Sequence, residues 1–489
     1  MKKSGFIDLL NRQFQDNRHR PALIYRQDTL TFGQLAAKGE NAAAFLQAEG
    51  LRRGDVVVLY TPEKLPFLVV HLGIILAGGI SLPLNFNFTP EELVYFLNDS
   101  GARFVFASGR QAESIRTIKP QCPRLEQVFD PGRTAAAPAS RKFKEIDLAA
   151  GAPCFMLYSS GTTGQPKGVV HTHGNVAAAL LSLQHGWQFR PEDVLLNVLP
   201  LFHIHGLSFA AHLSLVSGST MILKDKFHPR QTMENIHRAT VFMGVPTFYY
   251  SFLDRRELAE TAKKWRRTRL FTCGSAPIRP EILAEIEAIM GKHLINRYGM
   301  TESHVITSLP LAGPFKQGSV GLPLEGVDIK VEGGGSEAGE VKIRGETLFS
   351  CYWNKPEATG KAFDGEGFFG TGDLGYLDKD GFLTLVGRKD DLIITGGYNV
   401  YPPVVERVIN GFLGVKESAV FGIPDLKKGE QVAAAVVAGG SLDIDELRRY
   451  CRQRLVNYQC PLRFERLDSL PRNTMGKVLK RELKARFTV

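Results

Sequence analysis

Paired cysteines are absent from this sequence of 489 residues. The chain has six cysteines, and no two of them stand at Cys-x-x-Cys spacing. A disulfide framework and a zinc ribbon both need regularly spaced cysteines, so we expect neither. The opening residues, Met-Lys-Lys-Ser-Gly, lead into no apolar segment with a small-residue cleavage site, which disfavours export. Together these absences predict a cytoplasmic protein.

Long hydrophobic runs are absent as well. The longest uncharged stretch, residues 65–88, is interrupted by two prolines and three glycines. This composition predicts a buried helix, a glycine turn and a short strand, and it makes a membrane span the poorer interpretation. We therefore expect no integral membrane segment.

Basic residues exceed acidic ones, and the excess is local. The chain has 60 Lys+Arg against 50 Asp+Glu, a net charge of +10, and residues 442–489 alone hold 12 basic and 6 acidic residues. A nucleic-acid-binding protein would interleave such basic residues with aromatic ones. Here aromatic residues are few, and Glu465, Asp468 and Glu482 interrupt the positive run. We therefore expect anionic ligands but no nucleic-acid partner.

Apolar residues are plentiful, which excludes disorder. They make up 44% of a chain whose length calls for more than one domain. Apolar β-branched runs alternate with helical patterns, and this alternation predicts an α/β fold in which helices cover the sheets. The clearest runs are residues 56–60, 80–84, 103–107, 194–199, 220–223 and 239–243.

The pattern changes near Gly326. Shorter strands with glycine turns, at residues 327–331, 339–344 and 381–386, predict a β-rich subdomain. After Gly387-Arg388-Lys389-Asp390 the chain carries its own strand and helix patterns, which predicts a separate C-terminal domain. We expect an N-terminal domain of mixed and parallel sheets over residues 1–388, a connection at 389–391, and an α+β C-terminal domain over 392–489.

The strongest local signal is the sequence Tyr-Ser-Ser-Gly-Thr-Thr-Gly-Gln-Pro-Lys-Gly at residues 158–168. It lies between two apolar strand patterns and combines glycines, hydroxyls and one lysine. Such a loop suits phosphate, because glycines let backbone N–H groups approach the oxygens while the lysine supplies countercharge. The common P-loop pattern does not fit, because Pro166 stands where its second glycine should be.

Four motifs in order give the sequence a family resemblance. They are the loop at 158–168, Tyr-Gly-Met-Thr-Glu at 298–302, Thr-Gly-Asp at 371–373, and Pro-Arg-Asn-Thr-Met-Gly-Lys at 471–477. The chain thereby resembles the adenylate-forming superfamily from about residue 20 to its C-terminus. Members include acyl-CoA synthetases, luciferases and the adenylation domains of peptide synthetases. The resemblance implies an acid–thiol ligase that uses ATP, Mg²⁺ and CoA.

The resemblance also implies residue roles in nucleotide binding. The loop would hold the β- and γ-phosphates, Tyr298 would stack on adenine, Thr301 would contact phosphoryl oxygens, and Glu302 would bind Mg²⁺. An oxygen ligand of this kind suits a hard cation. The implied ATP and AMP ligands are Ser159, Ser160, Gly161, Thr162, Thr163, Gly164, Lys167, Gly274, Ser275, Ala276, Pro277, Tyr298, Gly299, Asp373 and Arg388.

Further implied roles fall in the C-terminal part. Asp373 and Arg388 match ribose-contacting positions, and Asp390 matches the hinge about which the family's mobile C-terminal domain swings. Lys477 resembles the lysine that stabilises developing charge during adenylation, which together with Thr301 and Glu302 completes the implied catalytic set. The resemblance implies that Gly396 and Gly397 line the tunnel for the CoA thiol arm.

The residue before the adenine-stacking tyrosine indicates which acid the enzyme activates. This position faces the acyl pocket in the family, and several motifs resemble the malonyl-CoA synthetase branch. Arg297 fills the position here and offers a fork suited to a second carboxylate, so we expect malonate or a similar short dicarboxylate. The alternative is an arginine that is paired with a carboxylate of the protein. His203 and His205 are implied neighbours of the acyl pocket, and no cysteine or acidic partner at ligand spacing supports zinc.

Several functions stay open beside the malonate hypothesis. A ligase for medium- or long-chain fatty acids or for aryl acids would share every nucleotide motif, and a stand-alone ligase could charge a carrier protein instead of CoA. The expected partners are a carboxylic acid and CoA. The sequence does not indicate the oligomeric state.

Overall fold

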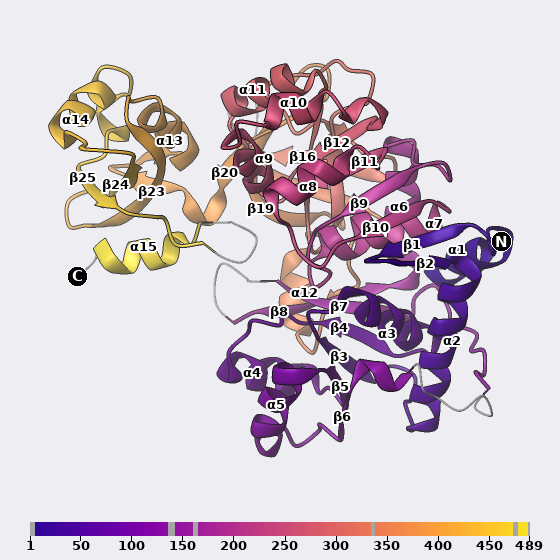
Figure 1. Cartoon of the computed structure of the whole chain (residues 1–489). Coiled ribbons are helices and arrows are strands. Elements are labelled where there is room, and N and C mark those ends of the chain that lie inside the picture. Colours follow the sequence, from indigo (N-terminus) through magenta and orange to yellow (C-terminus); the bar gives the residue numbers. More distant parts are fainter. Residues whose placement is uncertain (1–4, 135–141, 160–164, 334–337, 473–477, 488–489) are drawn as a thin grey trace. The chain divides into compact units, whose positions relative to one another are not determined.

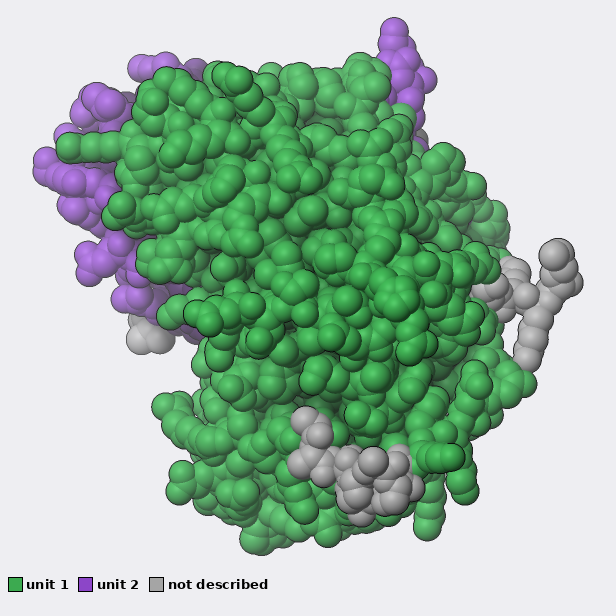
Figure 2. Space-filling model, turned by 45° about the vertical axis from the view of Figure 1, so that its right-hand side comes forward, with its two compact units in different colours: residues 1–328, 344–367 green, residues 329–343, 368–489 purple. Residues whose placement is uncertain are grey.

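The computed structural model describes residues 5–134, 142–159, 165–333, 338–472 and 478–487. The chain forms two compact units, shown in different colours in Figure 2. Unit 1 comprises Met1–Asp328 and Arg344–Gly367, and unit 2 comprises Ile329–Ile343 and Phe368–Val489. The predicted domain limits and the mobility of the C-terminal part stay predictions, because the division into units does not report motion.

Unit 1 contains a seven-stranded sheet in the order β18-β8-β7-β4-β3-β5-β6. The strands from β7 to β6 run parallel, whereas β8 and β18 are antiparallel additions at one edge. The strands are β3 (Val56–Tyr60), β4 (Ile80–Pro83), β5 (Phe104–Ala107), β6 (Gln127–Phe129), β7 (Pro153–Ser159), β8 (Lys167–Thr172) and β18 (Cys351–Tyr352).

A nine-stranded sheet completes unit 1 in the order β15-β14-β13-β12-β11-β9-β10-β1-β2. Its six central strands are parallel, and the antiparallel strands lie at its edges. The strands are β1 (Pro21–Tyr25), β2 (Asp28–Thr31), β9 (Val194–Asn197), β10 (Thr220–Leu223), β11 (Val241–Gly244), β12 (Leu270–Cys273), β13 (Leu294–Met300), β14 (His304–Ser308) and β15 (Leu322–Pro323).

Helices connect these strands and cover the sheets, as the predicted α/β architecture requires (Figure 1). The helices of unit 1 are α1 (Phe6–Asp16), α2 (Phe32–Ala48), α3 (Lys64–Leu76), α4 (Pro90–Ser100), α5 (Gly109–Ile118), α6 (His173–Gly186), α7 (Leu213–Val216), α8 (Pro229–Ile236), α9 (Pro246–Leu253), α10 (Leu258–Ala262), α11 (Pro280–Met290) and α12 (Pro356–Ala362). Short helices are η1 (Lys119–Gln121), η2 (Pro131–Thr134), the π-helix η3 (His205–His212) and η4 (Trp265–Arg267).

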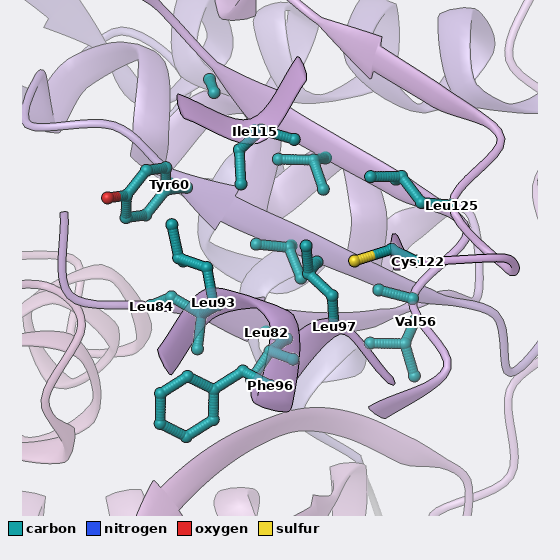
Figure 3. Packing of buried hydrophobic residues seen from close by; sticks show 14 of the residues in the cluster. Val56, Tyr60, Leu82, Leu84, Leu93, Phe96, Leu97, Ile115, Cys122 and Leu125 are labelled. Carbon is teal, nitrogen blue, oxygen red and sulfur yellow. The ribbon is translucent and has the colours of Figure 1, made fainter. Parts of the chain in front are cut away.

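One hydrophobic core of unit 1 lies between the seven-stranded sheet and helices α4 and α5. Figure 3 shows side chains of the strands, such as Val56 and Leu82, packed against Leu93, Phe96 and Leu97 of α4. All five are buried. Helix α4 begins with a capping box between Thr89 and Glu92 and ends at a left-handed glycine, Gly101. The helix is therefore fixed at both ends and along its apolar face.

Unit 2 holds two further sheets. The four-stranded sheet, in the order β16-β17-β19-β20, is the predicted β-rich segment, and a second sheet has the order β22-β21-β24-β23 with β25 beside β24. The strands are β16 (Val327–Glu332), β17 (Gly339–Gly345), β19 (Phe369–Leu377), β20 (Leu383–Arg388), β21 (Ile393–Thr395), β22 (Tyr398–Val400), β23 (Val415–Asp425), β24 (Gly429–Ala438) and β25 (Arg463–Leu467). The helices are η5 (Lys389–Asp391), α13 (Pro402–Asn410), α14 (Ile444–Arg452), η6 (Asn457–Gln459) and α15 (Lys480–Phe487).

The stretch at residues 65–88 has the structure predicted for it. Helix α3 and strand β4 are joined by a turn at Gly78 and Gly79. Within the described residues, no helix combines the length and apolar character that are needed to cross a membrane.

Several buried histidines make acid sensitivity an expected property of unit 1. The Nε2 atoms of His71 and His212 lie 2.8 Å apart, and Nδ1 of His71 lies 2.8 Å from Ser81 Oγ. Burial lowers the pKa of His71 to about 3 and the pKa values of His171 and His173 to about 4. At neutral pH these rings are therefore uncharged.

The free energy of unfolding is expected to decrease as the pH falls from about 6.5 toward 4. In this window the unfolded chain binds protons that the folded chain excludes, which costs about 1.4 kcal/mol per pH unit for each histidine. Above the window the stabilisation is complete. Urea unfolding at a series of pH values measures the slope. His71→Gln should reduce the slope by about one proton, and an unchanged slope in this variant would contradict the assignment.

Candidate active site

The carboxyl edge of the nine-stranded sheet gathers most predicted residues of unit 1. His203 and His205 follow β9, the turn at 274–277 follows β12, and Arg297 to Gly299 end β13. These strands are parallel to their neighbours between β10 and β13, so their carboxyl ends meet at one edge. Open α/β sheets bind ligands at this edge.

Arg297 is a buried cation with few polar contacts. It is 3% exposed, and its Nη2 donates a hydrogen bond to Ser275 Oγ at 3.0 Å. Its Cζ lies 5.0 Å from the ring centre of Phe209, and its Nε has no hydrogen-bond partner. Among the residues that the structure describes, no carboxylate forms an ion pair with it. Burial lowers the pKa of Arg297 to about 10, so the side chain keeps its charge at neutral pH.

Gly274 makes room for this arginine. A Cβ at position 274 would stand 2.7 Å from Arg297 Nε and 2.8 Å from its Cζ, which no real side chain tolerates. The family resemblance implies that residues 274–277 bind the nucleotide, and the structure adds a steric reason for glycine at the first of these positions.

Ser275 links Arg297 to His205. Nδ1 of His205 lies 3.3 Å from Ser275 Oγ, whereas its Nε2 has no hydrogen-bond partner. Burial, followed by the charge of Arg297, holds the pKa of His205 well below its usual value, and burial lowers the pKa of His203 to about 4. Because Ser275 accepts from Arg297, its own hydroxyl proton is available to Nδ1 of a neutral His205.

A second group of residues surrounds Glu302. Ser159 Oγ donates to Glu302 Oε1 at 3.0 Å, and the Tyr352 hydroxyl donates to the same oxygen at 3.3 Å. Lys167 Nζ lies 4.9 Å from the ring centre of Tyr352. The structure therefore brings together three predicted residues, Ser159, Lys167 and Glu302. Tyr352 is an additional member that no motif indicated.

His171 fixes the backbone next to Glu302. Nε2 of His171 donates to the Thr301 carbonyl at 2.8 Å, and the rings of His171 and His304 meet edge to face at 4.5 Å. Tyr298 and Glu302 are both buried, and Thr301 is partly buried. This packing fixes the turn on which the predicted catalytic Thr301 and Glu302 stand.

The donor set around Glu302 fits Mg²⁺. Glu302 is 6% exposed, and no group of three or more His, Cys, Asp or Glu side chains in the described part of the chain could enclose a metal ion. Mg²⁺ is usually held by one or two carboxylates together with substrate phosphates and water, not by a complete protein cage. A single buried carboxylate beside hydroxyl groups agrees with that mode of binding.

In unit 2 the two predicted ribose ligands are paired. Asp373 and Arg388 stand opposite each other in the β19–β20 ladder, and Arg388 Nη1 donates to Asp373 Oδ1 at 3.0 Å and to the Thr371 carbonyl at 3.3 Å. The carboxylate is thus oriented by the guanidinium. Asp390, the predicted hinge residue, lies in the short helix η5.

Gly396 and Gly397 form the turn of a β-hairpin between β21 and β22. Their φ angles are +57° and +83°, and the flanking pair is Thr395 and Tyr398. Two consecutive residues with positive φ require a conformation that glycine adopts readily, which explains the pair.

Some predicted residues lie outside the described part of the chain. They are Ser160, Gly161, Thr162, Thr163, Gly164 and Lys477.

Two families match the chain. The AMP-binding enzyme family matches residues 10–353, and the AMP-binding enzyme C-terminal domain matches residues 404–477. Malonate–CoA ligase from Arabidopsis thaliana is 32% identical over 94% of this chain and 82% of its own length. 2-Succinylbenzoate–CoA ligase from Bacillus subtilis (strain 168) is 33% identical over 95% of both chains. The structure of ATP-bound MatB from Rhodopseudomonas palustris matches with a TM-score of 0.93 and 36% identity over 99% of both chains.

The fold and the matches define an adenylate-forming enzyme, which confirms the resemblance seen in the motifs. The chain belongs to the AMP-binding enzyme family. It is an acid–thiol ligase that forms an acyl-CoA through an acyl adenylate, with ATP and CoA as co-substrates and Mg²⁺ as the metal typical of the family.

Proposed function

We propose that this ligase activates malonate or a similar short dicarboxylate. The observation that carries the proposal is Arg297, a buried cation that has one hydrogen-bond partner and no paired carboxylate in the described residues. Burying an arginine without an anion is costly, so such a side chain calls for a negatively charged partner. A second substrate carboxylate would supply one and would accept two parallel N–H bonds from the guanidinium.

The neighbours of Arg297 support the same substrate. Ser275 Oγ lies at hydrogen-bond distance from Arg297, and the Nε2 atom of His205 is buried and unpartnered. With the Nδ1 atom of His205 facing Ser275, its Nε2 carries the ring proton and is a potential donor to a carboxylate oxygen. The malonate–CoA ligase of Arabidopsis thaliana among the relatives agrees with this choice of acid.

In the proposed mechanism one substrate carboxylate attacks the α-phosphorus of ATP and pyrophosphate leaves. The thiol of CoA then attacks the acyl carbon and AMP leaves. Ser159 and Lys167, with the loop between them, would hold the β- and γ-phosphates. Glu302 would bind Mg²⁺, which supplies countercharge to the phosphates. Lys477 would stabilise charge during the first step only.

A second candidate is a ligase for fatty or aryl acids. Long-chain-fatty-acid–CoA ligase from Bacillus subtilis (strain 168) is 30% identical over 95% of this chain, so the relatives span several acids. In that case Arg297 would pair with the nucleotide or with a part of the chain outside the described residues.

Pyrophosphate release against a panel of acids tests the proposal. The panel contains malonate, methylmalonate, acetate, octanoate and 4-coumarate, each with and without CoA and Mg²⁺. We expect the highest kcat/KM with malonate or methylmalonate and a requirement for both CoA and Mg²⁺. Preference for octanoate or coumarate would keep the ligase and exclude the dicarboxylate.

A further inference from the structure

Helix α4 contacts both ends of the phosphate-binding loop. Strands β7 and β8 form an antiparallel hairpin whose last pair before the loop is Ser159 and Lys167. On one side of the loop, the hydroxyl of Tyr158 donates to Asp99 Oδ2 at 2.7 Å. On the other side, the hydroxyl of Tyr95 donates to the Pro166 carbonyl at 2.7 Å. Two residues of one helix thus hold the two ends of the loop.

Asp99 also connects the loop to the segment that carries Tyr352. Lys355 Nζ forms an ion pair with Asp99 Oδ1 at 2.8 Å, and the two side chains are 29% and 15% exposed. Lys355 follows Tyr352 by three residues, and Tyr352 donates to Glu302. The two oxygens of the Asp99 carboxylate therefore contact two different elements: Oδ2 accepts from Tyr158 of β7, and Oδ1 pairs with Lys355, the N-cap residue of α12.

Helix α4, which carries Tyr95 and Asp99, is rigidly packed. Leu93, Phe96 and Leu97 of α4 are buried in the core shown in Figure 3. Phe96 also meets the ring of Tyr158 edge to face at 4.7 Å. Cores are close-packed, so α4 cannot shift without disturbing its neighbours. Burial, followed by the bond to Asp99, raises the pKa of Tyr158, which keeps its hydroxyl protonated as a donor.

We propose that Asp99 and Tyr95 are positioning residues that fix Ser159 and Lys167, the described residues at the two ends of the phosphate-binding loop, for contact with the β- and γ-phosphates of ATP. This inference rests on the proposed phosphate-binding role of the loop. A hydroxyl and an ammonium group can serve the same phosphates only when each lies at the required place, so the positions of Ser159 and Lys167 matter. A displacement of about 1 Å in such a site can cost about 100-fold in rate.

The test separates ATP binding from the rest of the reaction. Asp99→Ala is expected to raise the KM for ATP at least tenfold and to slow pyrophosphate release, and Tyr95→Phe is expected to have a smaller effect in the same direction. The KM for the acid should stay the same. Thioester formation from synthetic malonyl adenylate should also be unchanged, because the adenylate has no β- or γ-phosphate.

The chain offers a matched control. In the same unit, the hydroxyl of Tyr25 donates to Asp225, which is paired with Arg26. This is also a tyrosine–aspartate–cation group, but its tyrosine ends β1 and its aspartate follows β10, two strands that carry no predicted site residue. Tyr25→Phe and Asp225→Ala should leave the KM for ATP unchanged. If the control variants raise it as much as Asp99→Ala does, the positioning role is wrong.

Two further outcomes would overturn the proposal. A normal KM for ATP in Asp99→Ala, or an equal loss in both half-reactions together with a lower melting temperature, would leave Asp99 a purely structural residue. The variant Lys167→Ala distinguishes a failure of the positioning role of α4 from a failure of the phosphate-binding role of the loop. If Lys167→Ala raises the KM for ATP and Asp99→Ala does not, the loop binds phosphate without help from α4. If neither variant changes it, the phosphate role of the loop is itself wrong.

Discussion

Lys477→Ala is expected to abolish acyl-adenylate formation while thioester formation from a supplied acyl adenylate continues. The family resemblance assigns this lysine to charge stabilisation in the first half-reaction, where a carboxylate attacks the α-phosphate of ATP. Removing one such electrostatic group from a transition state lowers the rate by about 10²- to 10³-fold. In the second half-reaction the adenylate is already formed, so the same ammonium group has no equivalent task.

Two assays measure the two steps separately. Pyrophosphate release with ATP and the preferred acid follows the first step, and acyl-CoA formation from synthetic adenylate and CoA follows the second. Arg486→Ala is a suitable control, because Arg486 is an exposed cation on α15 in the same basic segment. It should affect neither rate. Loss of both half-reactions in Lys477→Ala would contradict a role confined to adenylation.

The strands were the most predictable part of the fold. The apolar runs at 56–60 and 220–223 are strands β3 and β10 with those limits, and the others match within two residues. Such runs form buried parallel strands, because both faces of the sheets are covered by helices. The division of the strands between a seven-stranded and a nine-stranded sheet was not predictable, since it depends on pairings between strands that are distant along the chain.

The candidate site was predictable residue by residue but not as an arrangement. The motifs named Ser159, Glu302, Asp373 and Arg388 individually, and the structure places them in two pairs, one in each unit. Tyr352 had no motif, because β18 is two residues long and its contact with Glu302 spans fifty positions.

The contacts of Asp99 could not be predicted from the sequence either. The capping box at Thr89 and Glu92 marks the start of α4 in the sequence. The partners of its last turn, however, come from 59 and 256 positions away. Only the packing of α4 against the seven-stranded sheet brings these groups together.

Arg297→Met is expected to reduce kcat/KM for malonate by about 30- to 4,000-fold and to leave that for acetate nearly unchanged. Removing one partner of a buried, charge-assisted pair costs about 2–5 kcal/mol, and each 1.4 kcal/mol is about tenfold. Acetate has no second carboxylate and loses no such contact. Methionine keeps an unbranched apolar side chain at this buried position and removes the charged guanidinium. In the free enzyme the same substitution removes a buried cation that has no paired carboxylate in the described residues, so the melting temperature should stay the same or rise.

Arg269 provides the matched comparison. Its guanidinium Nε donates to Asp193 Oδ1 at 2.9 Å, and the Asp193 side chain is 1% exposed. Arg269→Met should therefore lower the melting temperature, because it leaves a buried carboxylate unpaired, and it should not change the preference between acids. If Arg297→Met instead lowers the melting temperature and reduces activity with malonate and acetate equally, Arg297 is a structural residue and the dicarboxylate proposal fails. If Arg297→Met is instead stable and loses activity with malonate alone, Arg297 binds the second carboxylate of the substrate.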